Sequence, residues 1–162
     1  MTLRAALVLL LEDARVADLR ARFDPVGTAA GIPPHITLLI PFGGDEQAAE
    51  ELFASWSPLR FSLTRVEEFP GVVWLAPEPN GELRTRILEL YERFPDWPPY
   101  DGEFPEPIPH ATVGKGDVAA AVRAEAEALL PVTFELREAA LLAESETDRW
   151  HELRRFPFRG GP

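Results

Sequence analysis

Two of the three histidines in this sequence share the same local setting. Each is preceded by proline and followed two residues later by threonine, which pairs His35 with Thr37 and His110 with Thr112. One short motif of this kind arises easily by chance, whereas two in matching settings do not. A lone histidine or threonine on a strand is more often structural, but the repetition predicts that these four side chains belong to one site.

The spacing of each motif gives it a chemical use. Side chains two residues apart on a β-strand point to the same face, so each imidazole lies beside its own hydroxyl. Histidine has an ordinary pKa of about 6.5, so a neutral imidazole can accept a proton while a charged one donates a proton in the same turnover. The hydroxyls of Thr37 and Thr112 can donate to phosphate oxygens and stabilise their developing charge. The four residues therefore predict acid–base catalysis of a displacement at phosphorus.

Strand-like and helix-like segments alternate along the chain, and the first motif opens a strand. Apolar periodicity and capping residues predict strands at residues 3–11, 35–40, 59–69 and 72–75 and helices at residues 14–23, 45–56 and 81–94. A stiff loop rich in proline and aromatic residues follows at residues 95–109 and leads into the second motif.

After this loop the order of elements repeats. Each motif is followed by glycines, an aspartate, a helix rich in alanine and glutamate, a proline and a strand. The distance from His35 to Pro58 is 23 residues, and that from His110 to Pro131 is 21 residues. This agreement predicts two related halves, each a β-α-β unit with one motif, facing each other across a shared cleft.

The length, composition and charge of the chain limit the number of domains and the kind of substrate that we expect. With 162 residues, 46% of them hydrophobic, we expect a single domain over residues 1–162. The lack of cysteine excludes disulfides and thiolate chemistry and fits a cytoplasmic protein. A net charge of −11 disfavours the tracking of a long nucleic acid, so we expect a small nucleotide or an RNA end as substrate. The apolar run at residues 5–11 is followed by Glu12 and Asp13, which favours a buried strand over a signal peptide, and no run suits a membrane span.

At the two motifs the sequence resembles the 2H phosphoesterases, in the branch of the 2′-5′ RNA ligases and 2′,3′-cyclic phosphodiesterases. The matching segments are residues 32–38 with Pro41 and Phe42, and residues 108–113, and the order of elements agrees as far as Phe158. The resemblance implies an α+β fold with two pseudo-symmetric lobes of mainly antiparallel sheet flanked by helices, with the active-site cleft between them. It also implies catalysis without a metal or other cofactor, with His110 as the base and His35 as the acid in hydrolysis.

The function implied is a phosphodiesterase that hydrolyses 2′,3′-cyclic nucleotides or 2′-5′ phosphodiester ends, acting as a monomer away from membranes. Two alternatives are a 2′-5′ RNA ligase running the reverse reaction and a non-catalytic nucleotide-binding module. A metallohydrolase is disfavoured because the histidines lack a third ligand at a suitable spacing; Asp101 and Glu106, which lie nearby in sequence, stand in a proline-rich segment without ligand spacing.

Three further residues are candidates for substrate binding. Lys115 lies between two glycines after the second motif, where it can steady a phosphate, although a solvated lysine at a turn fits equally well. Tyr100 and Trp97 in the proline-rich loop can stack on a base or cap the core. His151 has no threonine partner, and we expect it to be structural.

Overall fold

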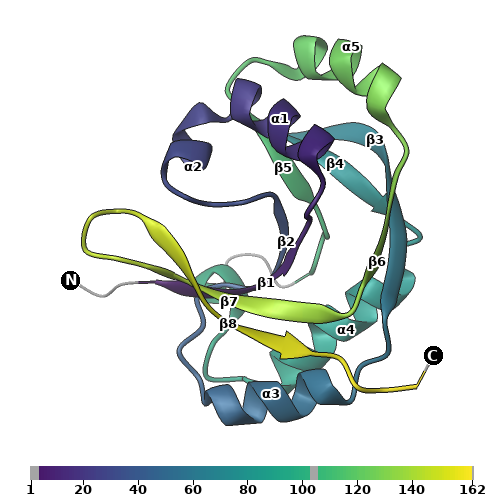
Figure 1. The fold of residues 1–162 in the computed structure, drawn as a ribbon. Helices are drawn as coiled ribbons and strands as arrows, with labels where there is room; N and C mark the ends of the chain where they lie inside the picture. The colour runs from purple at the N-terminus through teal and green to yellow at the C-terminus, as the bar shows by residue number, and fades with distance from the viewer. Residues whose placement is uncertain (1–3, 103–105, 162) are drawn as a thin grey trace.

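The computed structural model describes residues 4–102 and 106–161, in which strands and helices alternate (Figure 1). The strands and helices, in chain order, are β1 (Ala5–Leu10), α1 (Ala14–Phe23), α2 (Pro25–Ala29), β2 (His35–Leu39), α3 (Glu46–Ala54), β3 (Leu59–Phe69), β4 (Val72–Glu78), α4 (Gly81–Arg93), the 3-10 turn η1 (Pro99–Gly102), β5 (Ala111–Lys115), α5 (Ala119–Leu129), β6 (Val132–Leu136), β7 (Glu138–Glu144) and β8 (Trp150–Pro157). In the described part of the chain, no helix has the length and apolar character needed to cross a membrane.

The strands form two four-stranded sheets in which every pair is antiparallel. The first sheet has the order β2-β1-β7-β8 and the second has the order β5-β4-β3-β6. In both sheets the motif strand is at one edge, and its neighbour is the strand that precedes it in the chain. The α+β fold with two antiparallel sheets flanked by helices is therefore confirmed.

The helices are exchanged between the two sheets. Helix α1 connects β1 to β2 of the first sheet but packs against β5 of the second, whereas α4 connects β4 to β5 and packs against β2. Helix α3 packs against β8 and α5 against β3, so each sheet is covered by one helix from each half of the chain. In Figure 1, α1 and α5 lie together on one side of the molecule, and α3 and α4 lie on the other.

Local sequence explains where the first helices begin. The Asp13 carboxylate accepts hydrogen bonds from the backbone amides of Arg15 and Val16 at the start of α1. The Asp45 carboxylate accepts one from the amide of Gln47 at the start of α3. Capping by a short acidic side chain satisfies amides that have no partner within the helix, and both helices start where the sequence predicts.

Apolar residues cover both faces of β1, which explains the unbroken run seen in the sequence. Leu7 and Leu9 belong to the main core, which also contains side chains from α3, α4 and the second sheet. Ala6 and Val8 point to the opposite face and form a small cluster with two residues of β7, Ala140 and Leu142. The apolar run is therefore a strand buried on both sides, as predicted.

The predicted repeat holds for the motif strands and the helices but not for the strand that follows each helix. Strand β3 leaves the first half to join the second sheet, and β6, its counterpart in the repeat, pairs directly with it, with Phe61 opposite Phe134. The corresponding position beside β1 is taken by β7. The first β-α-β unit thus bridges the two sheets, whereas the second lies within one sheet.

Candidate active site

The two motifs meet because their strands are the edges of the two sheets that contact each other. Strand β2 carries His35 and Thr37, β5 follows His110 directly and carries Thr112, and β2 and β5 lie against each other. The charge of a protonated His110 lowers the pKa of His35, so the two imidazoles interact electrostatically. The fold therefore brings together the four residues that the sequence singled out.

In the first motif, successive side chains of β2 point alternately into the core and towards the candidate site. Ile36 and Leu38 are 0% and 1% exposed, while His35 and Thr37 are half-buried on the opposite face. Across the sheet, His35 pairs with Leu10 and Thr37 with Val8, so the apolar cluster on this face of β1 forms the floor beneath the motif.

The second motif has the same alternation, with aromatic neighbours in place of aliphatic ones. Ala111 and Val113 are buried, and Thr112 lies opposite Trp74 of β4. The ring of His110 makes edge contacts with the rings of Phe69 and Trp74, at centroid distances of 5.1 and 5.7 Å. These contacts restrict the orientation of the imidazole.

Both imidazoles are held by the same backbone contact. Nδ1 of His35 lies 2.8 Å from the carbonyl oxygen of Pro33, and Nδ1 of His110 lies 2.7 Å from that of Ile108. A carbonyl oxygen only accepts, so Nδ1 carries the hydrogen in each ring. Nε2 of each histidine is then the nitrogen that can exchange a proton with a substrate.

Burial keeps both imidazoles neutral in the free protein. It lowers the pKa of His35 to about 4, an effect opposed by the bond to Pro33 and reinforced by the charges of Arg20 and His110. Burial also lowers the pKa of His110, with the bond to Ile108 opposing and the charge of Lys115 adding to the effect. A bound anion would raise both pKa values and so favour the charged form of each imidazole.

Tyr100 joins the site from the proline-rich loop. Its backbone amide donates to the carbonyl of Ile40 at 2.7 Å, just beyond β2, and its hydroxyl is hydrogen-bonded to Thr37. Burial raises the pKa of Tyr100, and the bond to Thr37 opposes that rise. The φ angles of Tyr100 and Asp101 are 50° and 56°, a left-handed conformation that non-glycine residues rarely adopt.

The other candidates occupy different positions. Lys115 is exposed at the end of β5, close enough to His110 to affect its pKa. Trp97 is partly buried and packs against the main core, and its ring lies so near Gly43 that a Cβ there would be 2.5 Å away. His151 is exposed on β8, opposite Ala143. Residues 103–105 of the predicted loop lie outside the described residues.

Sequence reasoning missed Arg20 and Asp24, which form a buried ion pair close to His35. One signal was available, because Arg20 stands on the same helical stripe as the buried residues Val16 and Leu19. A charged residue on an apolar stripe needs a partner. The aromatic neighbours of His110 had no such signal, because they reach it only through the pairing of β4 with β5.

No group of three or more histidine and acidic side chains suited to a metal ion occurs among residues 4–102 and 106–161. The two acids considered from the sequence, Asp101 and Glu106, are both exposed, and Glu106 pairs with Arg84 at 3.5 Å. Within the ranges that the structure describes, no third ligand of the kind that a zinc site requires accompanies these histidines.

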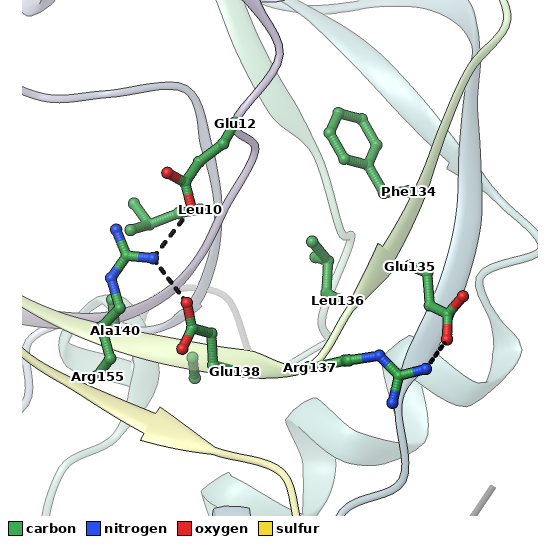
Figure 2. Close-up of a pocket in the computed structure, with 10 residues that line it drawn as sticks. Leu10, Glu12, Phe134, Glu135, Leu136, Arg137, Glu138, Ala140 and Arg155 are labelled. Atoms are coloured by element: carbon green, nitrogen blue, oxygen red, sulfur yellow. Dashed lines mark hydrogen bonds and ion pairs between the residues drawn. The ribbon is translucent and has the colours of Figure 1, made fainter.

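A surface pocket of about 340 Å³ lies beside the motif face of the first sheet (Figure 2). Leu10, the strand partner of His35, contributes to it, but no motif residue does. Its Arg155 is already bonded to Glu12 at 3.0 Å and to Glu138 at 2.6 Å, and its Arg137 is paired with Glu135. Because both arginines are already paired with carboxylates, we do not assign the phosphate to this pocket.

Comparison with known proteins agrees with this geometry. The family model of the 2′-5′ RNA ligase superfamily matches residues 10–148, a span that contains both motifs. The chain belongs to this superfamily. The resemblance of the chain to the 2H phosphoesterases, in the 2′-5′ RNA ligase branch, is thereby confirmed. A search of curated proteins found no match.

Solved structures share the fold of this 2′-5′ RNA ligase superfamily protein. Escherichia coli LigT complexed with NADP+ is 22% identical, with a TM-score of 0.62 over 96% of this chain and 97% of LigT. LigT complexed with ATP is 21% identical, with a TM-score of 0.61 over 96% and 98%. The protein TT0787 of Thermus thermophilus is 22% identical, with a TM-score of 0.58 over 98% and 100%. The fold therefore extends over nearly the whole length of these proteins.

Proposed function

We propose that the protein is a phosphodiesterase that hydrolyses 2′,3′-cyclic nucleotides or 2′-5′ phosphodiester ends. The observation that carries the proposal is the matched pair of histidines, each bound through Nδ1 to a carbonyl and each beside a threonine, on two strands that contact each other. Two imidazoles with free Nε2 atoms supply the acid and the base that an in-line displacement at phosphorus needs.

The threonines complete this arrangement. Thr37 and Thr112 are both half-buried, so their hydroxyls are partly removed from competing water. Neutral donors aimed at the non-bridging oxygens stabilise the charge that develops on them in the transition state. The hydroxyl of Tyr100, bonded to Thr37, holds one of these donors in place and adds a polar group to the substrate side. We assign Lys115 a supporting role in holding the phosphate.

The substrate is expected to be small. Escherichia coli LigT has been solved with ATP, with NADP+ and with 3′-AMP. The net charge of −11 repels a long polyanion. We therefore propose a mononucleotide or the end of an RNA as substrate, handled by a cytoplasmic monomer that forms one domain.

Ligation of 2′-5′ ends is the reverse of the same displacement, so the same residues serve both directions. Acid and base exchange roles when the reaction is reversed. A module that only binds nucleotides would not need two histidines with matched hydrogen bonds. Product identity, and not sequence, decides between these activities.

The test is incubation of the protein with the four 2′,3′-cyclic mononucleotides and with 2′-5′ dinucleotides, with products identified by chromatography. We expect opening of the cyclic phosphate, a loss of about 10² to 10⁴ in rate for His35→Ala and His110→Ala, and no change for His151→Ala. The rate of the double variant should fall by less than the product of the two single losses, because loss of either histidine alone already disables the acid–base pair. Near-normal rates in both single variants on a confirmed substrate would refute the assignment.

A further inference from the structure

Three aromatic rings from separate parts of the second sheet contact one another at the second motif. The ring centroid of His110 lies 5.1 Å from that of Phe69 and 5.7 Å from that of Trp74, and the centroids of Phe69 and Trp74 lie 4.9 Å apart. All three distances fall in the range that aromatic pairs favour. The imidazole meets both neighbours edge-on, at interplanar angles of 80° and 63°. We call Phe69 and Trp74 the aromatic pair of His110.

The sheet places the aromatic pair on the face of the second motif. Trp74 of β4 is the register partner of Thr112 of β5, and such partners point to the same face. Phe69 is the last residue of β3 and pairs with Val72, which stands two residues before Trp74 and so shares its face. The indole therefore lies beside both members of the second motif, beside His110 through its ring and beside Thr112 through its register.

Trp74 contributes a ring to this position and not a hydrogen bond. It is 7% exposed, and its Nε1 has no hydrogen-bond partner in the described part of the chain. A buried donor without a partner costs free energy, which a purely apolar side chain would avoid. The ring contacts with Phe69 and His110 explain an indole here better than its polar atom does.

The two catalytic histidines differ in what fixes their rings. The bond from Nδ1 of His35 to Pro33 is partly buried, whereas the bond from Nδ1 of His110 to Ile108 is exposed, and Ile108 itself is 55% exposed. Water competes for an exposed carbonyl oxygen, so this bond alone holds an imidazole weakly. The aromatic pair contacts His110 from β3 and β4 and adds the restraint that the exposed bond lacks.

We propose that Phe69 and Trp74 are positioning residues that hold His110 in one tautomer and one ring orientation, with Nδ1–H on the Ile108 carbonyl and Nε2 turned to the substrate. This inference rests on the proposed function and deepens it. An imidazole in the other tautomer presents the wrong protonation state at Nε2, and a displacement of about 1 Å can lower a rate by about 10². Neither aromatic ring exchanges a proton, so both act through His110.

Nitrogen NMR of isotope-labelled protein tests this role without any assay of activity. The nitrogen shifts of a neutral imidazole report which nitrogen carries the hydrogen. At about pH 8, where an imidazole is neutral, we expect wild-type His110 to be held as the Nδ1–H tautomer. Phe69→Leu and Trp74→Leu should give a mixture of both tautomers at His110 and leave His35 unchanged. Trp74→Phe keeps a ring at this position and should restore the wild-type tautomer.

Phe61→Leu is the matched control, because it removes another ring of β3 from the core side of the sheet. Phe61 is 3% exposed and packs against Phe134 at a centroid distance of 5.8 Å. The control should lower the free energy of unfolding and leave the tautomer of His110 as it is in the wild-type protein. If Trp74→Leu does not fold, Phe69→Leu carries the test, since the ring of Phe69 is only partly buried.

Kinetics on a 2′,3′-cyclic nucleotide that the wild-type protein opens provide the second measurement. The two leucine variants should lower kcat by about 10- to 100-fold and change KM by less than about threefold, because the substrate still binds. Phe61→Leu and Trp74→Phe should stay close to the wild-type protein. An unchanged His110 tautomer in every leucine variant that folds, or an unchanged kcat in one whose tautomer shifts, would overturn the proposal. If the wild-type protein cleaves no substrate, the proposed function fails, and the NMR result still decides whether the aromatic pair holds His110.

Discussion

Acidification should destabilise this protein through His35, and the size of the effect follows from its burial. The pKa of His35 is lowered to about 4 in the folded protein, against about 6.5 in an unfolded chain. Between these two values the unfolded chain binds more protons than the folded one, so stability present above the higher pKa is lost as the pH falls towards the lower one. From pH 7 to pH 5 this single group should cost about 2 kcal/mol.

Urea unfolding measured at several pH values between these limits provides the assay. His35→Gln cannot titrate, so its free energy of unfolding should fall by about 2 kcal/mol less than that of the wild-type protein over the same interval. His151→Gln, which alters an exposed histidine of β8, is the matched control and should follow the wild-type protein. The many carboxylates contribute equally to all three proteins and cancel in the comparison. Parallel curves for the wild-type and His35→Gln proteins would refute a lowered pKa for His35 in the folded protein.

Four further outcomes are expected. Thr37→Val and Thr112→Val should each lower kcat by roughly 10- to 1000-fold with little change in the urea midpoint, and unfolding without a specific rate loss would make these threonines structural. Activity on a 2′,3′-cyclic nucleotide should survive exhaustive dialysis against EDTA; loss that added zinc or manganese restores would argue for a metal. The rate should depend on pH as a bell whose two apparent pKa values belong to the histidine pair, and a single sigmoid would contradict the pairing. Phe53→Ala should destabilise the protein by about 3–5 kcal/mol, since this ring is fully buried against Trp56 and Phe156, and a loss below about 1 kcal/mol in urea unfolding would show that the core relaxes.

Many helices and strands could be predicted because the apolar periodicity and capping residues of each segment agree with the way that segment packs in the fold. The predicted helix at residues 14–23 and the strand at residues 59–69 match α1 and β3, and the helix at residues 45–56 differs from α3 only at its ends. Helix α2 was not anticipated, because five residues carry no periodicity and its cap, Asp24, already ends α1. The placement of β3 in the second sheet, away from β2, depends on sheet pairing, which no local pattern encodes.

The residues of the candidate site could also be predicted only in part. Matching sequence context brought out the two histidines and their threonines, since alternation along a strand fixes which side chains share a face. Tyr100 was found by its place in the loop, but its bond to Thr37 depends on a left-handed backbone that the sequence does not announce. The partners Phe69 and Trp74 contact His110 through pairing between strands. Trp97, which allowed two interpretations, is placed by its contact with Gly43.

The exchanged helices have a consequence for how the chain reaches its native state. Each sheet needs a covering helix from the other half, α1 on β5 and α4 on β2, so neither half can complete its own core. A gene divided in the segment between β4 and α4 would yield two fragments that each expose an apolar sheet face and must assemble with each other. Contacts between residues far apart in sequence must also form before either half gains stability, which slows folding. Because α1 covers β5 and α4 covers β2, the strands β2 and β5 cannot move apart without exposing apolar faces of both sheets. The distance between the two histidines therefore depends on the packing of the whole chain.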